Sequence, residues 1–332
     1  MTGPAIVVTG GAGFVGSHAC KALNAAGYRP ITVDNLSTGH ADAVKWGPLE
    51  RLDVRDRAGL VDVMRRYDAA AVMHFAAFAV ISDSIAHPDK YYDNNVSGLV
   101  SLLAAMKETG IGRLVFSSSC ATYGIPDQLP IRETVRQLPI NPYGWTKLMG
   151  ERIILDHAAA FGLRHGLLRY FNAAGADPEG ELSERHDPET RLIPLALMSA
   201  AGTRPALKVY GTDYATPDGT CIRDYIHVAD LADAHVRALG HLLDGGTSLA
   251  VNLGTGQGRS IREVCAAIAR VTRRIVPVED ALRREGDPPE LVADPSEARR
   301  LLGFRAIRSD IDTIVRDAAP HFGLDVSGGS DA

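Results

Sequence analysis

Near its amino end the chain reads Ala5-Ile6-Val7-Val8-Thr9-Gly10-Gly11-Ala12-Gly13-Phe14-Val15-Gly16, an apolar run followed by a glycine-rich turn. The apolar residues predict a short buried strand, and the residues after the turn predict a helix to about Ala26. Gly10, Gly13 and Gly16 allow a tight turn, close approach of the backbone to a pyrophosphate, and tight packing of the helix on the strand. The free N–H groups of that helix would face the phosphates. The stretch therefore predicts a dinucleotide-binding unit.

A second predicted strand, residues 28–33, ends at Asp34-Asn35. Asp34 lies 18 residues beyond Gly16, where a carboxylate accepts hydrogen bonds from the hydroxyls of the adenosine ribose. A 2′-phosphate on that ribose would meet like charge, so the sequence favours NAD over NADP. The alternative is that Asp34 only opens a turn.

Strands and helices continue to alternate along the first half of the chain. Apolar runs predict further strands at residues 51–54, 70–79, 113–119 and 163–171. Residues 93–107 predict a helix that ends at Gly110, with one apolar face formed by Val96, Leu99, Val100 and Leu103. This alternation predicts an α/β fold of the Rossmann type, with a doubly wound parallel sheet. Asp53, in the first of these strands, is a candidate acceptor for the adenine amine.

A tyrosine and a lysine lie four residues apart in Asn141-Pro142-Tyr143-Gly144-Trp145-Thr146-Lys147, at the start of a predicted helix that ends at Phe161. Residues at this spacing share one helix face. A tyrosine titrates near pH 10, so holding Tyr143 as a phenolate at pH 7 requires ~4 kcal/mol. One cation at about 4 Å supplies up to ~4 kcal/mol before desolvation, and Lys147 plus an oxidised nicotinamide ring would supply two. The pair is a candidate base, although the pattern also arises by chance.

Three serines, Ser117, Ser118 and Ser119, end the strand at residues 113–119. The carboxyl end of a parallel strand is where such sheets bind ligands. The Ser119 hydroxyl is therefore a candidate bridge between a substrate and Tyr143. The alternative is ordinary polar turn chemistry.

The character of the sequence changes after Asn172. Residues 173–218 are loop-rich, and strands are predicted at 220–228 and 248–253 with a helix between them. We do not interpret the glycines of 254–258 as a second nucleotide site, because Ser260 and Glu263 form a capping box for the helix that follows, to Val271. A further helical segment is predicted at 295–302.

These patterns predict two domains and a tail. Residues 1–172 form the NAD-binding domain, to which the chain returns at about 225–254. Residues 173–325 mainly form a smaller α/β substrate-binding domain, and residues 326–332 form a flexible tail.

The composition excludes several classes of protein. The chain has 332 residues, of which 45% are hydrophobic and 23% charged, as in ordinary soluble globular proteins. A net charge of -5 without any basic block argues against a nucleic-acid surface, and we expect neither a membrane span nor a signal peptide. The four cysteines contain no CxxC pair, so we expect reduced thiols in a cytoplasmic protein and no metal site. They are Cys20, Cys120, Cys221 and Cys265.

Nine segments resemble, in order, those of the extended short-chain dehydrogenase/reductase superfamily, and within it the UDP-hexose 4-epimerases. The resemblance runs from Val7 to about Leu302, and nine matches in the right order do not arise by chance. The segments are residues 9–16, 34–36, 74–77, 91–96, 116–124, Tyr143xxxLys147, 169–172, 223–228 and 284–287.

The resemblance implies that the protein interconverts UDP-glucose and UDP-galactose through a transient 4-keto sugar. Tyr143 would remove the proton of the 4-hydroxyl while hydride passes from C4 to NAD⁺, and the rotated sugar would take the hydride back on its other face. Lys147 would lower the pKa of Tyr143 and hold the nicotinamide ribose, and Ser119 would mediate the proton path.

The resemblance also implies binding residues. For the cofactor these are Gly10, Gly13, Phe14, Val15, Gly16, Asp34, Asn35, Asp53, Val54, Phe75, Ala76, Ala77, Asn95, Ser117, Tyr143, Lys147 and Tyr170. For the substrate they are Ser119, Asn172, Arg191, Leu192, Tyr210, Arg223, Arg284, Asp287 and Leu291. Asn172, Arg223 and Arg284 would contact the diphosphate. Asp287 would bind the uridine ribose, Tyr210 would pack near the uracil, and Leu291 would border the C2 substituent of the sugar.

The sequence departs from relatives at three places. Sugar-nucleotide 4,6-dehydratases carry an acidic pair where this chain has Cys120-Ala121, so dehydration is excluded. Ala79 replaces a lysine that some epimerases place near the pyrophosphate, and Arg191 replaces an asparagine near the diphosphate. Substrate identity is therefore less constrained than reaction type.

Alternatives remain open at this stage. The same reaction on UDP-xylose/arabinose, UDP-glucuronate or UDP-N-acetylglucosamine is one, and an NAD-sensing regulator without catalysis is another. The resemblance further implies a homodimer, in which the helices at 93–107 and 143–161 pair across a two-fold axis.

Overall fold

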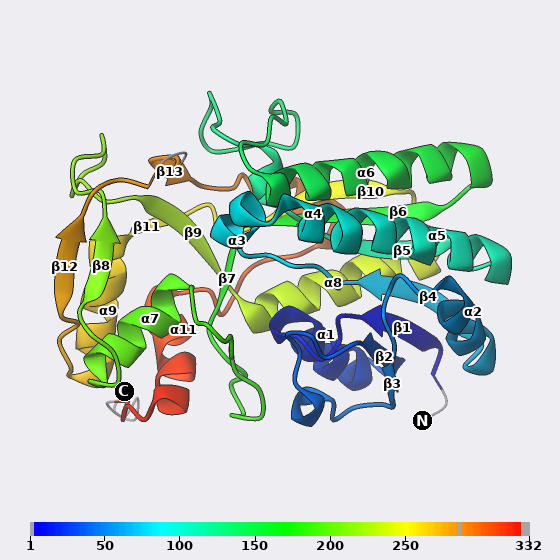
Figure 1. Cartoon of the computed structure of the whole chain (residues 1–332), viewed down its shortest axis with the longest axis horizontal. Coiled ribbons are helices and arrows are strands. Elements are labelled where there is room, and N and C mark those ends of the chain that lie inside the picture. Colours follow the sequence, from blue (N-terminus) through cyan, green and yellow to red (C-terminus); the bar gives the residue numbers. More distant parts are fainter. Residues whose placement is uncertain (1–2, 285–286, 327–332) are drawn as a thin grey trace.

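The computed structural model describes residues 3–284 and 287–326 (Figure 1). The predicted tail at 326–332 lies outside these residues except for Val326. Among the described residues, no helix combines the length and apolar character that a membrane span requires.

The larger part of the molecule is built on a parallel sheet of seven strands, in the order β10-β6-β5-β4-β1-β2-β3. This sheet confirms the predicted α/β fold of the Rossmann type. Its strands are β1 (Ala5–Thr9), β2 (Arg29–Asp34), β3 (Leu49–Arg51), β4 (Ala69–His74), β5 (Arg113–Ser119), β6 (Arg164–Tyr170) and β10 (Leu249–Leu253). The inner parts of the central strands are mostly apolar and buried, as is typical of a parallel sheet with helices on both faces.

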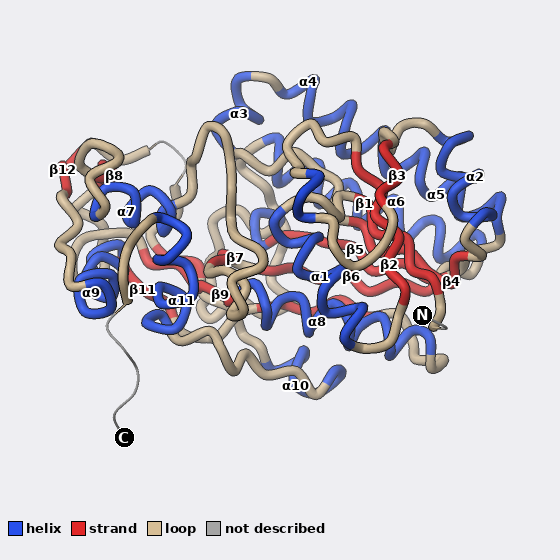
Figure 2. Tube along the Cα trace, turned by 90° about the horizontal axis from the view of Figure 1, so that it is seen from below, coloured by secondary structure: helices blue, strands red, loops and turns tan. Residues whose placement is uncertain are grey.

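Successive residues of β1 supply the two hydrophobic cores. Val7 packs with helices α2, α5 and α6 on one face, whereas Ile6 and Val8 pack with α1, α8 and α10 on the other. Figure 2 shows α1 and α8 in front of the sheet. The helices are α1 (Phe14–Ala25), α2 (Arg57–Arg66), α5 (Gly98–Thr109), α6 (Pro142–Phe161), α8 (Val228–Leu243) and α10 (Ser296–Leu302). Two short helices, α3 (Ile81–Ala86) and α4 (Pro88–Tyr91), precede α5.

The smaller part lies at the other end of the molecule (Figure 1). Strand β9 pairs with β7, β11 and β13, and β8 pairs with β12. A separate hydrophobic core joins these strands to three helices. The elements are β7 (Asn172–Ala174), β8 (Leu207–Tyr210), β9 (Ile222–His227), β11 (Gly258–Ser260), β12 (Val278–Ala281), β13 (Glu290–Leu291), α7 (Leu192–Ala200), α9 (Ile261–Thr272) and α11 (Ile311–Ala318). The predicted capping box at Ser260 and Glu263 opens α9.

Two strand predictions were wrong in their bounds. β3 covers residues 49–51 rather than 51–54, because its partner β2 ends at Asp34, which pairs with Arg51. β4 ends at His74 rather than Ala79, because the N–H groups of Phe75 and Ala76 both donate to the carbonyl of Thr9 and leave the ladder.

The helix predicted at 93–107 is also different. A π-helical turn, η2 (Tyr92–Ser97), precedes α5, and Val100 is exposed although Leu99 and Leu103 are buried. Within the segment predicted as loop-rich, α7 and β8 form, and α11 was not predicted. The spacing of Ile311, Ile314, Val315 and Ala318 after the N-cap Asp310 is the signal that identifies α11.

Candidate functional site

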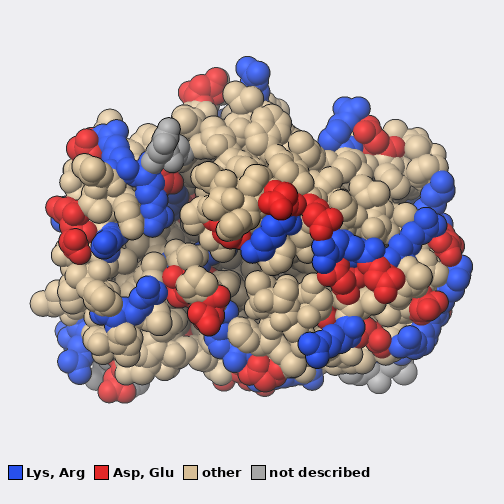
Figure 3. Space-filling model, in the orientation of Figure 1, with Lys and Arg blue, Asp and Glu red and all other residues tan. Residues whose placement is uncertain are grey.

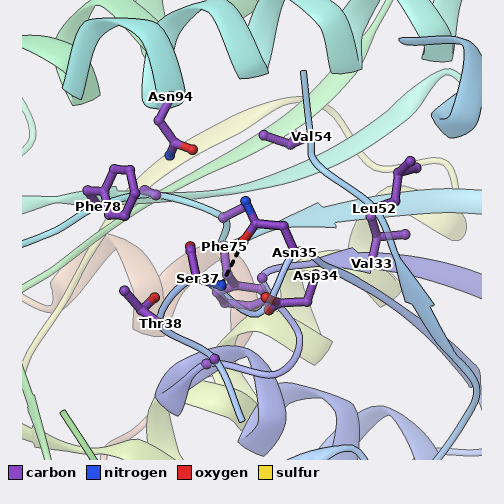
Figure 4. A pocket seen from close by; sticks show the side chains of 15 residues that line it. Val33, Asp34, Asn35, Ser37, Thr38, Leu52, Val54, Phe75, Phe78 and Asn94 are labelled. Carbon is purple, nitrogen blue, oxygen red and sulfur yellow. Dashed lines mark hydrogen bonds between the residues drawn. The ribbon is translucent and has the colours of Figure 1, made fainter. Parts of the chain in front are cut away.

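A pocket lies at the carboxyl ends of β1 to β4. Figure 4 shows Asp34, Asn35, Ser37 and Thr38 on one side and Asn94 opposite them. β1 and β4 are neighbours in the sheet. From β1 the chain continues to β2 and β3 on one side, and from β4 it continues to β5 and β6 on the other side. Open α/β sheets bind ligands where the strand order reverses in this way. The lining residues are Gly10, Gly13, Val33, Asp34, Asn35, Ser37, Thr38, Gly39, Leu52, Val54, Phe75, Ala76, Ala77, Phe78 and Asn94.

The glycines of the first turn let the backbone pass where a side chain would not fit. Gly10 has a φ of +73°, and a β-carbon there would lie 2.5 Å from the amide nitrogen of Ala76. A β-carbon on Gly16 would lie 2.1 Å from the carbonyl oxygen of Gly10. Helix α1 therefore begins close to the end of β1, with its N-cap Gly13 at the pocket.

Asp34 is held by the backbone of two segments. Its carboxylate accepts from the N–H of Ala12 at 3.0 Å and from the N–H of Leu36 at 2.8 Å. Burial raises the pKa of Asp34, and these two hydrogen bonds oppose the rise. The carboxylate is thus fixed at the pocket wall, as an acceptor for ribose hydroxyls requires.

Several residues predicted to bind the cofactor do not line this pocket. Asp53 accepts from Asn35 at 2.9 Å and pairs with Arg55 at 2.8 Å, and these hydrogen bonds hold the pKa of Asp53 below its usual range. Asn95 bonds to both backbone groups of Phe78 and donates to Thr146 at 3.0 Å. Phe14, Val15 and Gly16 form the first turn of α1.

The structure also adds pocket residues that sequence reasoning missed. They are Val33, Ser37, Thr38, Gly39, Leu52, Phe78 and Asn94. The polar turn directly after Asp34 was a local signal for Ser37, Thr38 and Gly39. No local sequence pattern indicates that Asn94 lines the pocket, because its position depends on the π-helical turn.

Tyr143, Lys147 and Ser119 come together at the end of β5. All three are buried, and Asn141 caps α6 by accepting from the N–H of Gly144 at 2.8 Å. The Lys147 ammonium donates to the carbonyl of Ser117 at 2.8 Å and lies 5.9 Å from the centre of the Tyr143 ring. The Ser119 hydroxyl accepts from the N–H of Ala121 at 3.1 Å and is close enough to Tyr143 to lower the pKa of its phenol.

Burial acts on both titrating groups of this centre. It raises the pKa of Tyr143, as does the neighbouring Tyr170, whereas the Ser119 hydrogen bond and the charge of Arg191 lower it. Burial lowers the pKa of Lys147 to about 8, and the charge of Glu151 opposes this. The polypeptide alone therefore holds Tyr143 neutral at pH 7. The predicted phenolate requires a further positive charge at the site.

Tyr170 extends the centre from the next strand. Its hydroxyl accepts from the Ser117 hydroxyl at 3.0 Å, so two residues predicted to bind the cofactor contact each other. The Tyr170 ring lies 6.2 Å from the ring of His235 on α8, which also packs against Phe75 of the pocket. His235 thus links the group around Tyr143 and Tyr170 to the pocket.

The residues predicted for the substrate come from the smaller part of the fold. Arg223 pairs with Asp287 at 3.4 Å, and the Arg284 guanidinium lies 3.9 Å from the centre of the Tyr210 ring. In Figure 3 basic side chains gather on this side of a hollow in the surface. The grouping places two cations and one carboxylate beside an aromatic face, which suits a nucleoside diphosphate.

The other predicted substrate residues lie between the two parts. Arg191 precedes Leu192 at the start of α7, and its charge lowers the pKa values of Tyr143 and Tyr170. Asn172 begins β7. Leu291 in β13 packs against a small hydrophobic cluster that contains Cys120, the residue after Ser119.

Two groups of side chains among the described residues have the spacing of cation ligands. One is Asp177, Glu179 and Glu181, and the Lys21 ammonium already lies 2.6 to 2.8 Å from all three carboxylates. The other is Glu184, His186 and Glu189, in which His186 lies 3.5 Å from each carboxylate. Neither group contains a residue of the candidate site.

Known proteins match the chain over most of its length. A model of the NAD dependent epimerase/dehydratase family matches residues 6–254. A UDP-glucose 4-epimerase of Rhizobium leguminosarum bv. trifolii is 51% identical over 318 residues, which cover 96% of this chain and 97% of that protein.

Solved structures resemble the whole fold. A UDP-glucose 4-epimerase from Brucella ovis in complex with NAD has a TM-score of 0.96 at 58% identity, and the match covers 98% of this chain and 100% of that one. A UDP-glucose-4-epimerase from Stenotrophomonas maltophila, with bound NAD and formylated UDP-arabinopyranose, has a TM-score of 0.94 at 40% identity. That match covers 96% of this chain and 98% of the other.

Proposed function

The chain belongs to the NAD dependent epimerase/dehydratase family, and from this membership we propose that it is an isomerase that uses NAD to interconvert UDP-glucose and UDP-galactose. One observation carries the proposal: Tyr143, Lys147 and Ser119 are buried together at the end of β5, beside a pocket with dinucleotide-binding geometry. Two relatives that match 96% and 90% of the chain are UDP-glucose 4-epimerases.

The pocket fits NAD. Gly10 and Gly16 leave no room for β-carbons, which brings the start of α1 close to a pyrophosphate, and Asp34 presents a fixed carboxylate to the adenosine ribose. Phe75, Ala76 and Ala77 would line the far wall, and Lys147 with Tyr170 would hold the nicotinamide end. When bound there, the nicotinamide would supply a hydride acceptor and donor for C4 of the sugar.

Tyr143 would take the proton of the 4-hydroxyl, directly or through the Ser119 hydroxyl. Because burial raises the pKa of Tyr143, the phenolate would form only when a second cation joins the Lys147 ammonium. The oxidised nicotinamide ring carries that charge. Base strength would thus be tied to the presence of the oxidised cofactor, and the same hydroxyl would return the proton to the rotated 4-keto sugar.

The sugar must be free to rotate while the nucleotide stays bound. Arg223, Arg284 and Asn172 would bind the diphosphate, Asp287 the uridine ribose, and Tyr210 the uracil. Arg191 and Leu192 would close the site from α7, and Leu291 would limit the size of the C2 substituent. All these groups would contact the nucleotide or the edge of the pocket. None of them would hold the 4-keto sugar in one orientation.

The direct test is product analysis with purified protein. UDP-galactose should be converted to UDP-glucose, and a panel of UDP-xylose, UDP-glucuronate and UDP-N-acetylglucosamine should be converted more slowly. An absorbance band of reduced nicotinamide on incubation with UDP-glucose would exclude a purely regulatory role. Turnover restricted to another sugar of the panel would contradict the proposed pair.

We expect Asp34→Ala to narrow the preference for NAD over NADP. Removing the like charge that meets a 2′-phosphate, a repulsion of several kcal/mol, should lower the dissociation constant of NADP by about tenfold or more. Titration of both cofactors measures this. Asp62→Ala, on the exposed side of α2, makes the same charge change as a control. Equal affinity of the unmodified protein for NAD and NADP would contradict the role of Asp34.

Arg284→Ala should weaken the binding of UDP by about 1.5–3 kcal/mol, the range for hydrogen bonds to a charged group. Titration calorimetry with UDP measures the change. Arg283→Ala is the matched control, because that guanidinium pairs with Asp213 at 2.7 Å and lies on the Tyr214 ring. If both variants bind UDP as the unmodified protein does, Arg284 is a surface charge without a role in binding.

We also propose a homodimer built on α5 and α6. Large apolar side chains are exposed on these helices, and a second copy of the chain would cover them. They are Val100, Trp145, Met149, Leu155 and Phe161. An isologous two-fold pairing of both helices would cover the outer face of α6 that carries Trp145 and Met149.

Light scattering at micromolar concentration should therefore give the mass of two chains. Met149→Glu should shift the protein to monomers, because it places a charge in the buried interface. Ile275→Glu, at a side chain that is 83% exposed away from these helices, should leave the dimer intact. A monomeric unmodified protein would refute the interface.

Two further assignments belong to this proposal. The domain division at Asn172 is supported by the separate core of the smaller part, with α8 and β10 returning to the large sheet. The four cysteines are free thiols, which supports a cytoplasmic location.

A further inference from the structure

Glu151 lies one helical turn beyond Lys147 on α6. Tyr143, Lys147 and Glu151 follow at intervals of four residues, so they form one stripe along the buried face of the helix. Glu151 is 2% exposed, the least of the three. It is the one member of the stripe without a role in the proton path.

The Glu151 carboxylate is fully bound. One oxygen accepts from the Ser118 hydroxyl at 2.5 Å and from Nε of Arg169 at 2.9 Å. The other accepts from Nη2 of Arg169 at 2.7 Å and from the Gln137 amide at 3.1 Å. Four donors on two oxygens prevent its rotation.

These contacts join α6 to two strands at the same level. Ser118 on β5 and Arg169 on β6 are opposite each other in the register of the sheet. Glu151 therefore bridges the helix to both strands at one point, and neither strand can slide along the helix without breaking a hydrogen bond.

The residues on either side of Ser118 make the catalytic contacts. The carbonyl of Ser117 accepts from Lys147 at 2.8 Å, and the Ser119 hydroxyl is close enough to Tyr143 to lower the pKa of its phenol. A shift of α6 against β5 would therefore change both contacts together. Ser118 is the central link between them.

We propose that Glu151, acting through Ser118, is a positioning residue that holds the end of β5 against α6 so that Ser119 and Lys147 meet Tyr143 in the reactive geometry. This inference rests on the proposed function. The same carboxylate has an electrostatic effect, because its charge opposes the fall that burial causes in the pKa of Lys147.

The test is Ser118→Ala, which removes the link and leaves the ion pair of Glu151 and Arg169 in place. We expect kcat with UDP-galactose to fall by about tenfold, within the 10²-fold that a 1 Å misplacement of catalytic groups can cost. KM should not change, because no substrate contact is lost, and Ser118→Thr should restore kcat. Ser199→Ala is the matched control, because its hydroxyl also donates at 2.5 Å, to the carbonyl of Pro205, away from the site.

A second measurement does not depend on turnover. The absorption of phenolate in NAD-loaded protein, minus that of the Tyr143→Phe variant, follows the titration of Tyr143 alone. Ser118→Ala should raise the pKa seen in this titration, because Ser119 loses its position beside Tyr143. A change confined to thermal stability would not move this value.

Three results would overturn the inference: unchanged kcat in Ser118→Ala, a fall in activity explained by KM, or no rescue by Ser118→Thr. Failure of the unmodified protein to act on UDP-galactose would refute the proposed function instead. In that case an unchanged titration of Tyr143 in Ser118→Ala would still refute the positioning role.

Discussion

Tyr143→Phe should lower kcat by about 10²–10⁴-fold, the usual contribution of a positioned general base. The substitution removes only the hydroxyl, so the ring keeps its packing in the buried site. UDP binding should hardly change, because the predicted nucleotide contacts come from the smaller part of the fold. Steady-state kinetics with UDP-galactose and calorimetry with UDP separate the two effects.

Tyr123→Phe is the matched control for this substitution. That tyrosine is also buried, but its hydroxyl donates to Asn252 at 2.7 Å and accepts from Arg169, so its loss should affect stability more than turnover. Near-normal turnover in Tyr143→Phe would contradict the assignment of Tyr143 as the base.

Gly10→Ala should abolish NAD binding and destabilise the fold. The φ of +73° costs a residue with a β-carbon about 1–2 kcal/mol. The added carbon would lie 2.5 Å from the amide nitrogen of Ala76, and overpacking of this kind adds about 1–3 kcal/mol. Relief of the clash would push the segment after β4 into the pocket. Denaturant unfolding and the NAD content of the purified protein measure both effects.

Gly110→Ala is the control that separates backbone strain at positive φ from the steric clash expected in Gly10→Ala. Gly110 has a φ of +75°, and a β-carbon there would meet nothing within 4 Å. The Gly110→Ala variant should therefore lose only the unfolding free energy that corresponds to the strained backbone, and it should bind NAD normally. Equal behaviour of the two variants would mean that the contact with Ala76 does not matter.

Local signals predicted the fold well where a residue's neighbours in sequence are also its neighbours in space. β1 and β5 have the predicted bounds, and α6 starts at Pro142 after its Asn141 cap. The glycine turn, the cap and the apolar runs each act within a few residues. The Tyr143 and Lys147 pair could be placed on one face for the same reason.

The errors arose where distant segments decide the outcome. β4 stops at His74 because the next two N–H groups bind Thr9, which is 65 residues from His74. Asn95 is engaged by Phe78 and Thr146, whereas the preceding Asn94 lines the pocket. Neither choice is visible in the periodicity of the sequence. The polar network around Glu151, which draws on two strands and a helix, is equally invisible there.

The four-residue spacing of the buried stripe on α6 makes this helix intolerant of changes in length. Inserting or deleting one residue between Tyr143 and Glu151 turns everything beyond it by about 100°. Lys147 would leave Ser117, and Glu151 would leave Ser118 and Arg169. Homologous chains should therefore place insertions and deletions outside this stretch of α6. They should keep the distance from Tyr143 to Glu151 constant.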